Sequence, residues 1–353
     1  LQSGTGPDRH GGSVLDTLRG GGYKPAARMI QYLIRRLLWA IPVLLAIMVV
    51  TFFLARAIPG GPFDFAGEKQ LPESVRKNLE RKYGLDRPMY VQLGKWIWDG
   101  IRFDFGPSYA SRSQTVNDIL KRTFPISFQL GFLALLFALL IGIPLGTIAA
   151  VKQNSPIDYG ATFLAILGVS MPTMMTGPLL MWVFAIILGW LPTARWGTDY
   201  TQLYLGFFPN IFSGKFWLHA ILPAVTLGLA YSASIARLTR ASLLQVIRED
   251  YIKTAYAKGL PARRTIIVHG LRNSLIPVAT VLGPMFAGIV TGSLVVEQIF
   301  GIAGMGKYFV TAITNRDYPM IMGSVLVYSV LLVAANIVVD VSYAWLDPRI
   351  RYD

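Results

Sequence analysis

YIKTAYAKGLPARRTIIVHGLRNSLIP, the stretch from Tyr251 to Pro277, is polar and basic and lies between two long apolar runs. Its first part predicts a short helix over residues 251–258, because apolar or small side chains recur at positions i, i+3 and i+4. These side chains are Ile252, Ala255 and Tyr256. Gly259 suits the left-handed backbone position after a helix, and Pro261 prevents the helix from continuing.

A second helix is expected from Arg263 onward, running towards the next apolar run. Together the two helices would form a small knob held on two membrane helices. Three small residues, Ala255, Ala257 and Gly259, would let another backbone approach closely. The alternative interpretation is an amphipathic helix lying on the lipid surface, and periodicity alone does not separate the two.

The composition is that of a polytopic membrane protein, because 53% of the 353 residues are hydrophobic and only 15% are charged, with a mean hydropathy of +0.48. The net charge of +14 is explained first by membrane orientation, so no nucleic-acid partner is expected. The chain has no cysteine, which excludes disulfides, thiolate metal sites and cysteine catalysis. With only His10, His219 and His269 available, no histidine-based metal site is expected. No catalytic residue is expected either, because nothing near His269 in the sequence supplies a nucleophile.

Six charge-free stretches are long enough to cross a bilayer, which takes about 20 residues per helix. They are Leu37–Ala55, Thr123–Val151, Tyr159–Ala194, Phe216–Ala236, Asn273–Val296 and Tyr318–Val339. The third exceeds one helix, so we expect a break near Pro172 or Pro178 and part of an external loop. The first has features of a cleavable signal peptide, but it is longer than the usual apolar core of about 7–15 residues, so we interpret it as the first span.

Charge in the short loops gives the orientation. The connection between the fourth and fifth spans is rich in basic residues: Arg248, Lys253, Lys258, Arg263, Arg264 and Arg272. The short loops on the other side carry two basic residues each, so the positive-inside rule places the basic connection in the cytoplasm. An even number of spans then places both termini in the cytoplasm as well.

The loop Pro59–Arg122 falls outside and is expected to be folded. A helix is expected to begin at Pro72-Glu73 and to end at Gly84, and a second helix should follow it. The apolar stripes are Val75, Leu79 and Tyr83 in the first helix and Leu93, Trp96, Ile97 and Ile101 in the second. Val75, Leu79 and Tyr83, and Leu93, Trp96 and Ile97, are expected to pack inward. A cap over the helix bundle and a docking surface for a partner are both open interpretations of this region.

Four charged residues near span ends are candidates for a gate or an ion pair: Arg237, Arg240, Glu297 and Asp340. For the two arginines, at the inner end of the fourth span, the alternative is ordinary positive-inside anchoring. Asp340, at the inner end of the sixth span, is expected to form a structural ion pair. Glu297, at the outer end of the fifth span, either lines an external gate or is an exposed interfacial acid.

Two glycine pairs inside spans, Gly142 with Gly146 and Gly288 with Gly292, have the spacing of close helix packing in lipid. They predict helix–helix contact without saying with which chain. Kinks are expected at the prolines within spans: Pro42, Pro144, Pro172, Pro178, Pro223 and Pro284.

The basic loop resembles the cytoplasmic coupling segment of permease subunits of ATP-binding-cassette importers. The resemblance is carried by Thr254–Leu260 (TAYAKGL) and His269–Pro277 (HGLRNSLIP), which match the version found in peptide importers. Further stretches resemble the B permease subunit of oligopeptide importers: Ala57–Phe63, Lys82–Leu85, Asp104–Ser108, Ala233–Arg240, Val296–Gly301, Asn315–Tyr318 and Asp347–Tyr352. Two residues depart from the pattern. Tyr256 stands where an arginine is usual, and Ala303 replaces a proline in an external turn, which is expected to loosen that turn.

The resemblance implies an all-α membrane protein with six transmembrane helices, the type I ABC importer permease fold and an external helical insertion between helices 1 and 2. It implies half of a translocation pathway for oligopeptides or dipeptides in the cell membrane of a prokaryote. The implied partners are a homologous second permease, two ATP-binding cassette subunits, an extracytoplasmic solute-binding protein, the peptide substrate and membrane lipid. The residues implied to couple to the ATPase subunits are Tyr251, Thr254, Ala255, Tyr256, Ala257, Lys258, Gly259 and Leu260.

The expected segments follow from the spans and the resemblance. Residues 1–28 are Gly-rich and precede Met29, so we expect a tag or a disordered leader there. The others are 29–58 with the first transmembrane helix, the extracytoplasmic helical insertion 59–122, the transmembrane core 123–346 with its coupling segment 247–275, and the cytoplasmic tail 347–353. No G-x-x-x-x-G-K-[ST] pattern occurs in the chain, so ATP and Mg²⁺ are expected to bind to the partner subunits and no cofactor to this chain.

Three alternatives remain. A permease of the same family could carry nickel, glutathione or another small solute. An ion-coupled secondary transporter would place paired acids or broken helices at the bilayer midplane, and the span centres here carry no charge. An intramembrane protease would need a membrane-embedded base, and the only candidate, His219, sits near the outer end of its span.

Overall fold

A computed structural model describes residues 25–63, 72–111, 113–197 and 206–346. Most of the expected leader and the whole of the expected C-terminal tail lie outside the described residues. Within those ranges the regular elements are helices, and the only strand-like feature is an isolated bridge between Pro107 and Thr115. The expected all-α class is therefore confirmed.

Among the described residues, five helical stretches are long and apolar enough to cross a membrane. They are α1 (Pro25–Ala57), α4 (Val116–Val151), α7 (Gly214–Val246), α11 (Ile276–Gly292) continuing into α12 (Leu294–Ile299), and α14 (Tyr318–Leu346). A bent pair of helices makes a sixth span if it is counted as one. The expected number of spans is reached, and the helices extend beyond the charge-free cores, as α4 does by starting at Val116 rather than Thr123.

The third span is broken at Pro172, one of the two positions expected. Helix α5 (Pro156–Ser170) ends there, and α6 (Thr173–Met181) with the π-helix η1 (Trp182–Ile187) continues at an angle of 107°. The residue before a proline is disfavoured in the helical region, and Met171 accordingly adopts extended angles, φ −81° and ψ 120°. Pro178, the other candidate, sits inside α6.

The fifth span is less regular than the single stretch expected over Asn273–Val296. It consists of α10 (Arg272–Ser274), α11 and α12, with interruptions at Leu275 and Ser293. Pro277 has no amide hydrogen, which removes one hydrogen bond from the ladder close to the first interruption. Nothing in the structure explains the second.

Helices α4 and α7 form the centre of the bundle, and glycine allows their contact. A Cβ atom on Gly142 would lie 2.6 Å from the carbonyl oxygen of Ser232, and one on Gly146 would lie 2.4 Å from that of Ala236. These distances are too short for any side chain, so the predicted close packing is confirmed for this pair. The second predicted pair differs, because a Cβ on Gly288 would meet nothing within 4 Å.

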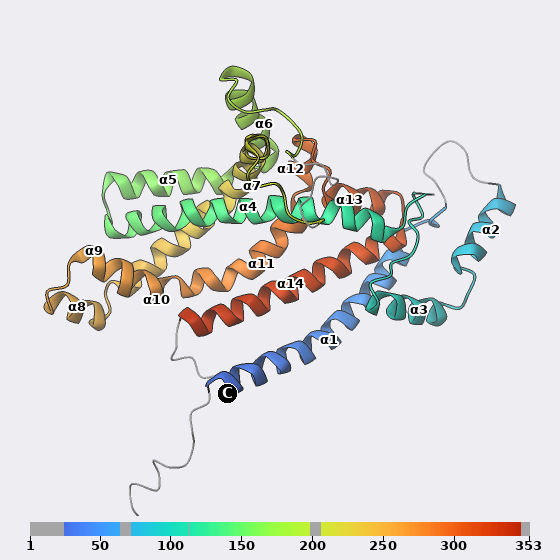
Figure 1. Cartoon of the computed structure of the whole chain (residues 1–353), viewed down its shortest axis with the longest axis horizontal. Helices are drawn as coiled ribbons and strands as arrows, with labels where there is room; N and C mark the ends of the chain where they lie inside the picture. The colour runs from blue at the N-terminus through green and yellow to red at the C-terminus, as the bar shows by residue number, and fades with distance from the viewer. Residues whose placement is uncertain (1–24, 64–71, 112, 198–205, 347–353) are drawn as a thin grey trace, which may run out of the picture.

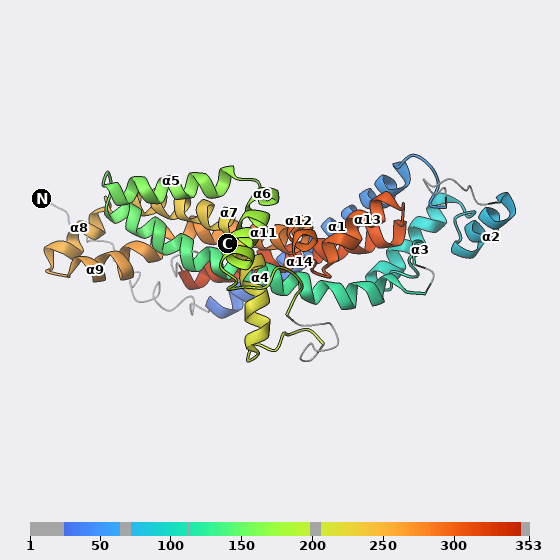
Figure 2. The ribbon, with the colours of Figure 1, turned by 90° about the horizontal axis from the view of Figure 1, so that it is seen from above.

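The remaining helices are short and lie mainly at the two ends of the molecule (Figure 1). At one end are α8 (Asp250–Ala257), α9 (Ala262–Arg264) and the π-helix η3 (Thr265–Leu271). At the other are α2 (Glu73–Tyr83) and α3 (Met89–Ile101), with α13 (Met305–Thr314) between them and the bundle centre. Figure 2 shows the same separation along the long axis from a second direction.

Candidate functional site

The expected knob is present and consists of α8 packed on η3. Ile252 is only 1% exposed and Ala255 is buried, so one face of α8 is fixed to the following helix. The start of α8 is tied to α10, because the Nδ2 of Asn273 donates a hydrogen bond to the Tyr251 hydroxyl at 2.9 Å. The knob is therefore one packed unit between α7 and α11.

The end of α8 has the predicted cap. Gly259 adopts φ +78°, in the left-handed region that glycine tolerates at no steric cost. Its amide donates to the carbonyl of Tyr256 at 2.9 Å, and the amide of Leu260 donates to the carbonyl of Ala255 at 3.2 Å. This pair of bonds is the Schellman motif, which satisfies carbonyls that the helix end leaves unpaired.

The rest of the surface of the knob is open. The expected coupling residues Tyr251, Thr254, Tyr256, Ala257, Lys258 and Gly259 are exposed, with Leu260 half-buried beside them. Ala255, the other expected coupling residue, is buried. A Cβ on Gly259 would meet nothing within 4 Å, so no part of the described chain covers this position. At the start of the helix, Lys253 donates to Asp250 at 2.8 Å, and the pKa of that carboxyl is lowered by this hydrogen bond and by the ammonium charge.

Behind the knob, α7 is joined to α5 by a two-pronged ion pair. Arg240 donates from Nε and Nη2 to the two carboxylate oxygens of Asp158, at 2.6 and 2.7 Å. Asp158 is only 2% exposed and also accepts from the Asn154 amide. Arg240 therefore forms an ion pair, and a role for it in a gate stays a prediction. Arg237, one turn earlier, is exposed, and its role as a gate stays a prediction.

Sequence reasoning missed Asp158 as the partner of Arg240. The available signal was its place two residues after Pro156 in the first turn of a helix, on the side where the basic residues gather. The ion pair expected for Asp340 is present, since Arg36 donates to its Oδ1 at 2.8 Å. This contact joins α1 to α14 near the same end of the bundle as the knob.

Glu297 is buried, so the interpretation of an exposed interfacial acid is wrong. It is 1% exposed, and its Oε1 accepts from the hydroxyls of Ser127 and Ser293 at 2.7 Å each. The turn that follows α12 packs closely against the Glu297 carboxylate and needs a glycine at position 304, because a Cβ atom on Gly304 would lie 2.3 Å from the carboxyl carbon of Glu297. The turn is also held to α4, because the Met305 amide donates to the Ser127 hydroxyl at 2.7 Å. A gating role for Glu297 stays a prediction.

Three of the stretches noted in the sequence meet at the end of the molecule that carries α2 and α3 (Figure 1). The buried carboxylate of Asp317 accepts hydrogen bonds from the Ser108 hydroxyl and from the Ala110 amide. The guanidinium group of Arg316 lies so close to Gly60 that a Cβ on Gly60 would be 2.8 Å from its Cζ. Sequence order separates these residues by up to 257 positions, so only the fold reveals that they form one cluster.

The insertion between α1 and α4 is helical as expected, but its two helices are held differently. Helix α2 has no buried residue, and Val75 is 41% exposed, so the expected inward packing of its whole stripe is wrong. Only its end is anchored, where Tyr83 lies 4.7 Å from Tyr109, ring centre to ring centre. Burial raises the pKa of Tyr109 well above its usual value. Helix α3, in contrast, buries Trp96.

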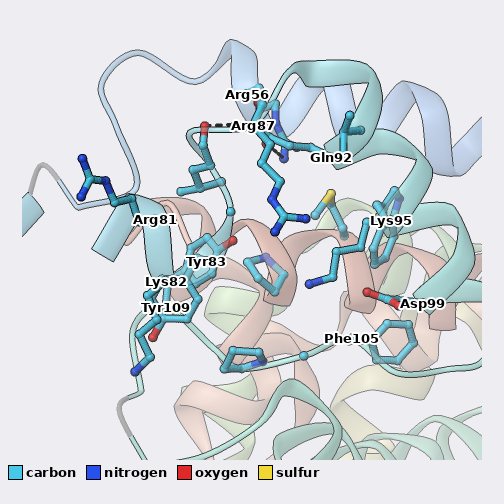
Figure 3. A pocket seen from close by; sticks show the side chains of 18 residues that line it. Arg56, Arg81, Lys82, Tyr83, Arg87, Gln92, Lys95, Asp99, Phe105 and Tyr109 are labelled. Atoms are coloured by element: carbon cyan, nitrogen blue, oxygen red, sulfur yellow. Dashed lines mark hydrogen bonds between the residues drawn. The ribbon is translucent and has the colours of Figure 1, made fainter. Parts of the chain in front are cut away.

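A cavity of about 250 Å³ lies between α3 and the ends of α1 and α2 (Figure 3). Its charged lining residues are Arg56, Arg81, Lys82, Arg87, Lys95 and Asp99. Five of the six are cations, so the cavity attracts anions.

Two family models match the chain. The model described as a binding-protein-dependent transport system inner membrane component matches residues 142–352, and the model of the N-terminal part of such components matches residues 29–131. The chain therefore belongs to the family of inner-membrane components of binding-protein-dependent transport systems. It is a multi-pass membrane transport component rather than an enzyme, and this assignment confirms the expected permease fold.

Several relatives share nearly the whole length. An oligopeptide transport system permease protein, OppB, of Haemophilus influenzae is 41% identical over 92% of this chain and 100% of its own. A dipeptide transport system permease protein, DppB, of Bacillus subtilis is 44% identical over 92% of this chain and 98% of its own. A solved chain of the MetNI methionine ABC transporter in an inward-facing conformation aligns with a TM-score of 0.49 at 16% identity, over 65% of this chain and 98% of that chain.

Proposed function

We propose that this chain is the membrane permease subunit of an ATP-driven importer of oligopeptides or dipeptides. It forms half of the translocation pathway, and a homologous second permease forms the other half. The observation that carries the proposal is the match, over 92% of the chain, to permeases named for oligopeptide and dipeptide transport. The helical bundle with an exposed, firmly packed knob at one end supports it.

The exposed surface of α8 is the part of the knob that binds to an ATPase subunit. ATP and Mg²⁺ bind to that subunit. A contact at Tyr256 moves α8, and the buried side chains of Ile252 and Ala255 make η3 move with it. Because η3, α10 and α11 follow one another with little interruption, the displacement reaches the fifth span.

The Arg240–Asp158 pair extends the same movement to the third span. A bidentate contact between a guanidinium group and a carboxylate fixes distance and orientation together, so α5 follows the inner end of α7. The break at Pro172 separates α5 from α6 and gives the span a place to bend.

The knob and both termini face the cytoplasm in this proposal, and α2 and α3 lie on the outside. There the insertion docks a solute-binding protein that delivers the peptide. The chain's lack of cysteine gives a clean test of orientation. In intact cells, an impermeant thiol reagent should label Lys77→Cys on α2 and should not label Arg264→Cys unless the cytoplasmic side is opened. The reverse pattern would overturn the orientation.

The function itself is tested by purifying the chain from its native membrane and identifying what accompanies it. Two ATPase chains and a second permease are expected. In proteoliposomes, the binding protein with peptide should stimulate ATP hydrolysis. Stimulation by nickel or glutathione, with none by peptide, would assign the chain to another substrate, and purification without ATPase chains would contradict the class.

A further inference from the structure

Helix α3 reaches well into the membrane-spanning part of the bundle. The Trp96 indole N–H donates to the carbonyl of Met48 at 3.3 Å, and a Cβ on Gly100 would lie 2.3 Å from the Met48 side chain and 3.4 Å from that of Leu326. Met48 is nine residues before the end of α1, and Leu326 is eight after the start of α14. At about 1.5 Å per residue, the last turn of α3 lies about 12–14 Å along these spans from their outer ends.

The face of α3 turned away from the bundle is apolar and exposed. Tyr90 is 76% exposed, Trp98 57% and Ile101 60%, and their spacings of eight and three residues place them on one side of the helix. The Arg102 guanidinium lies 4.1 Å above the Trp98 ring, so a cation flanks this stripe. An exposed aromatic and aliphatic stripe beside a cation is typical of a helix at a bilayer surface.

The basic cavity lies along an adjacent side of the same helix, lined from α3 by Gln92, Lys95 and Asp99 among others. Figure 3 shows the head groups of Arg87 and Lys95 pointing into it. Among the described residues, neither of these cations lies within salt-bridge distance of a carboxylate. Arg56, at the outer end of α1, also lines the cavity and donates to the Gln92 side chain at 2.8 Å. A cationic cavity at the outer end of a membrane span fits a phosphate group.

We propose that α3 is an interfacial helix of the outer leaflet and that the cavity beside it binds the phosphate of an anionic phospholipid. The stripe of Tyr90, Trp98 and Ile101 contacts the acyl chains, and Arg87 and Lys95 hold the headgroup. The depth of α3 and its apolar stripe favour lipid over an acidic segment of a partner protein, because a soluble protein reaches the outer surface and not the side of a span. This site is separate from the peptide pathway and from the coupling knob.

The position of the stripe is tested with a nitroxide label on Ile101→Cys and, as the matched control, on Lys77→Cys of α2, in the transporter reconstituted into phosphatidylglycerol-containing vesicles. The Ile101 label should collide with oxygen more than with a water-soluble nickel complex, and the Lys77 label should show the reverse. A Ile101 label that behaves like the Lys77 label, or one shielded from both reagents by protein, would overturn the proposal.

The headgroup site is tested by measuring which lipids stay bound to the purified transporter after a mixture of phosphatidylglycerol and phosphatidylcholine. The native chain should retain phosphatidylglycerol preferentially. In the double variant Arg87→Gln/Lys95→Gln, the preference for phosphatidylglycerol over phosphatidylcholine should fall roughly tenfold. Lys77→Gln, outside the cavity, should retain it. Equal retention of both lipids by the native chain contradicts the site, and full displacement of the lipid by millimolar inorganic phosphate would assign the cavity to free phosphate. None of these readouts depends on peptide transport or ATP hydrolysis.

Discussion

Helices α8 and α2, at opposite ends of the molecule, are built alike and held differently. Each is short and ends at a glycine in the left-handed conformation, φ +78° at Gly259 and φ +68° at Gly84. Each glycine is followed by a leucine whose backbone amide donates to a carbonyl five residues earlier. The Leu85 amide donates to the carbonyl of Glu80 at 2.8 Å, as the Leu260 amide does to that of Ala255. Yet α8 buries Ile252 almost completely, and α2 buries nothing.

The comparison indicates that the local sequence decides where a helix ends, whereas packing decides whether a displacement of the helix is passed on to its neighbours. A push on α8 is carried to η3 because the buried face cannot move alone. A push on α2 is carried only to its last turn, where Tyr83 meets Phe63 and Tyr109. We therefore expect α8 to act in coupling and α2 to act as an adjustable contact on the outer side.

Substitution of the two cap glycines should separate the helices most strongly. Gly259→Val forces a β-branched residue into a left-handed conformation, at a cost of about 1–3 kcal/mol, and should abolish peptide transport or the assembly with ATPase subunits. Space is not the cause, because a Cβ at Gly259 meets nothing within 4 Å. Gly259→Asn, which tolerates this conformation, should therefore keep most of the transport activity. Gly84→Val carries the same backbone strain and should leave coupling intact, and normal transport by Gly259→Val would refute the role of the knob.

Truncation of the apolar face should give the next largest contrast. Ile252→Ala removes a buried side chain and should cost about 2–5 kcal/mol, seen as a lower melting temperature or an uncoupled ATPase activity in the purified complex. Val75→Ala in α2 removes an exposed side chain and should change neither quantity measurably. Equal effects of the two substitutions would mean that α8 and α2 are held in the same way.

Replacement of α2 by a flexible linker tests the outer contact. Substituting residues 73–82 with glycine and serine, which keeps the anchoring Tyr83, should leave melting nearly unchanged, because α2 has no buried residue. Stimulation of ATP hydrolysis by the binding protein should fall if α2 helps to dock it. A lower melting temperature with a full response to the binding protein would instead identify the insertion as a cap. Deleting the longer segment Glu73–Arg102 would also remove the buried Trp96, so it answers the question less directly.

The smallest effect is expected at the exposed pair of Asp250 and Lys253. The Lys253 ammonium lowers the pKa of Asp250, so the pair stabilises α8 above the ordinary pKa of the carboxyl, and the contribution is lost as the pH falls through the lowered value. Both groups are exposed and screened by salt. The melting temperature of Asp250→Asn should therefore equal that of the native chain at neutral and at low pH. A clearly lower melting temperature at neutral pH would show that the pair stabilises α8 more than its exposure suggests.

The sequence predicted those features that depend on neighbours along the chain. Gly259 and Gly84 predicted the helix ends, Pro172 was one of the two prolines predicted to break the third span, and charge-free runs predicted the spans. The sequence did not predict contacts between residues that are far apart in the chain. Asp158 and Arg240 are 82 positions apart, and the place of Asp158 in the first turn of a helix does not single it out as the partner of Arg240. The burial of Glu297 depends on Ser127 of α4, on Ser293 between α11 and α12, and on the close approach of Gly304. The exposure of α2 depends on which parts of its surface the rest of the fold leaves uncovered.

The central claim is that the exposed face of α8 meets an ATPase subunit, and a cross-link tests it most directly. A photoreactive reagent attached to Tyr256→Cys, in a chain that has no other cysteine, should form adducts with an ATPase chain in the assembled transporter. The same reagent on Lys77→Cys should form none with that chain. Adducts of the Tyr256 position with lipid alone would contradict the account, because they would identify α8 as a helix lying on the membrane surface.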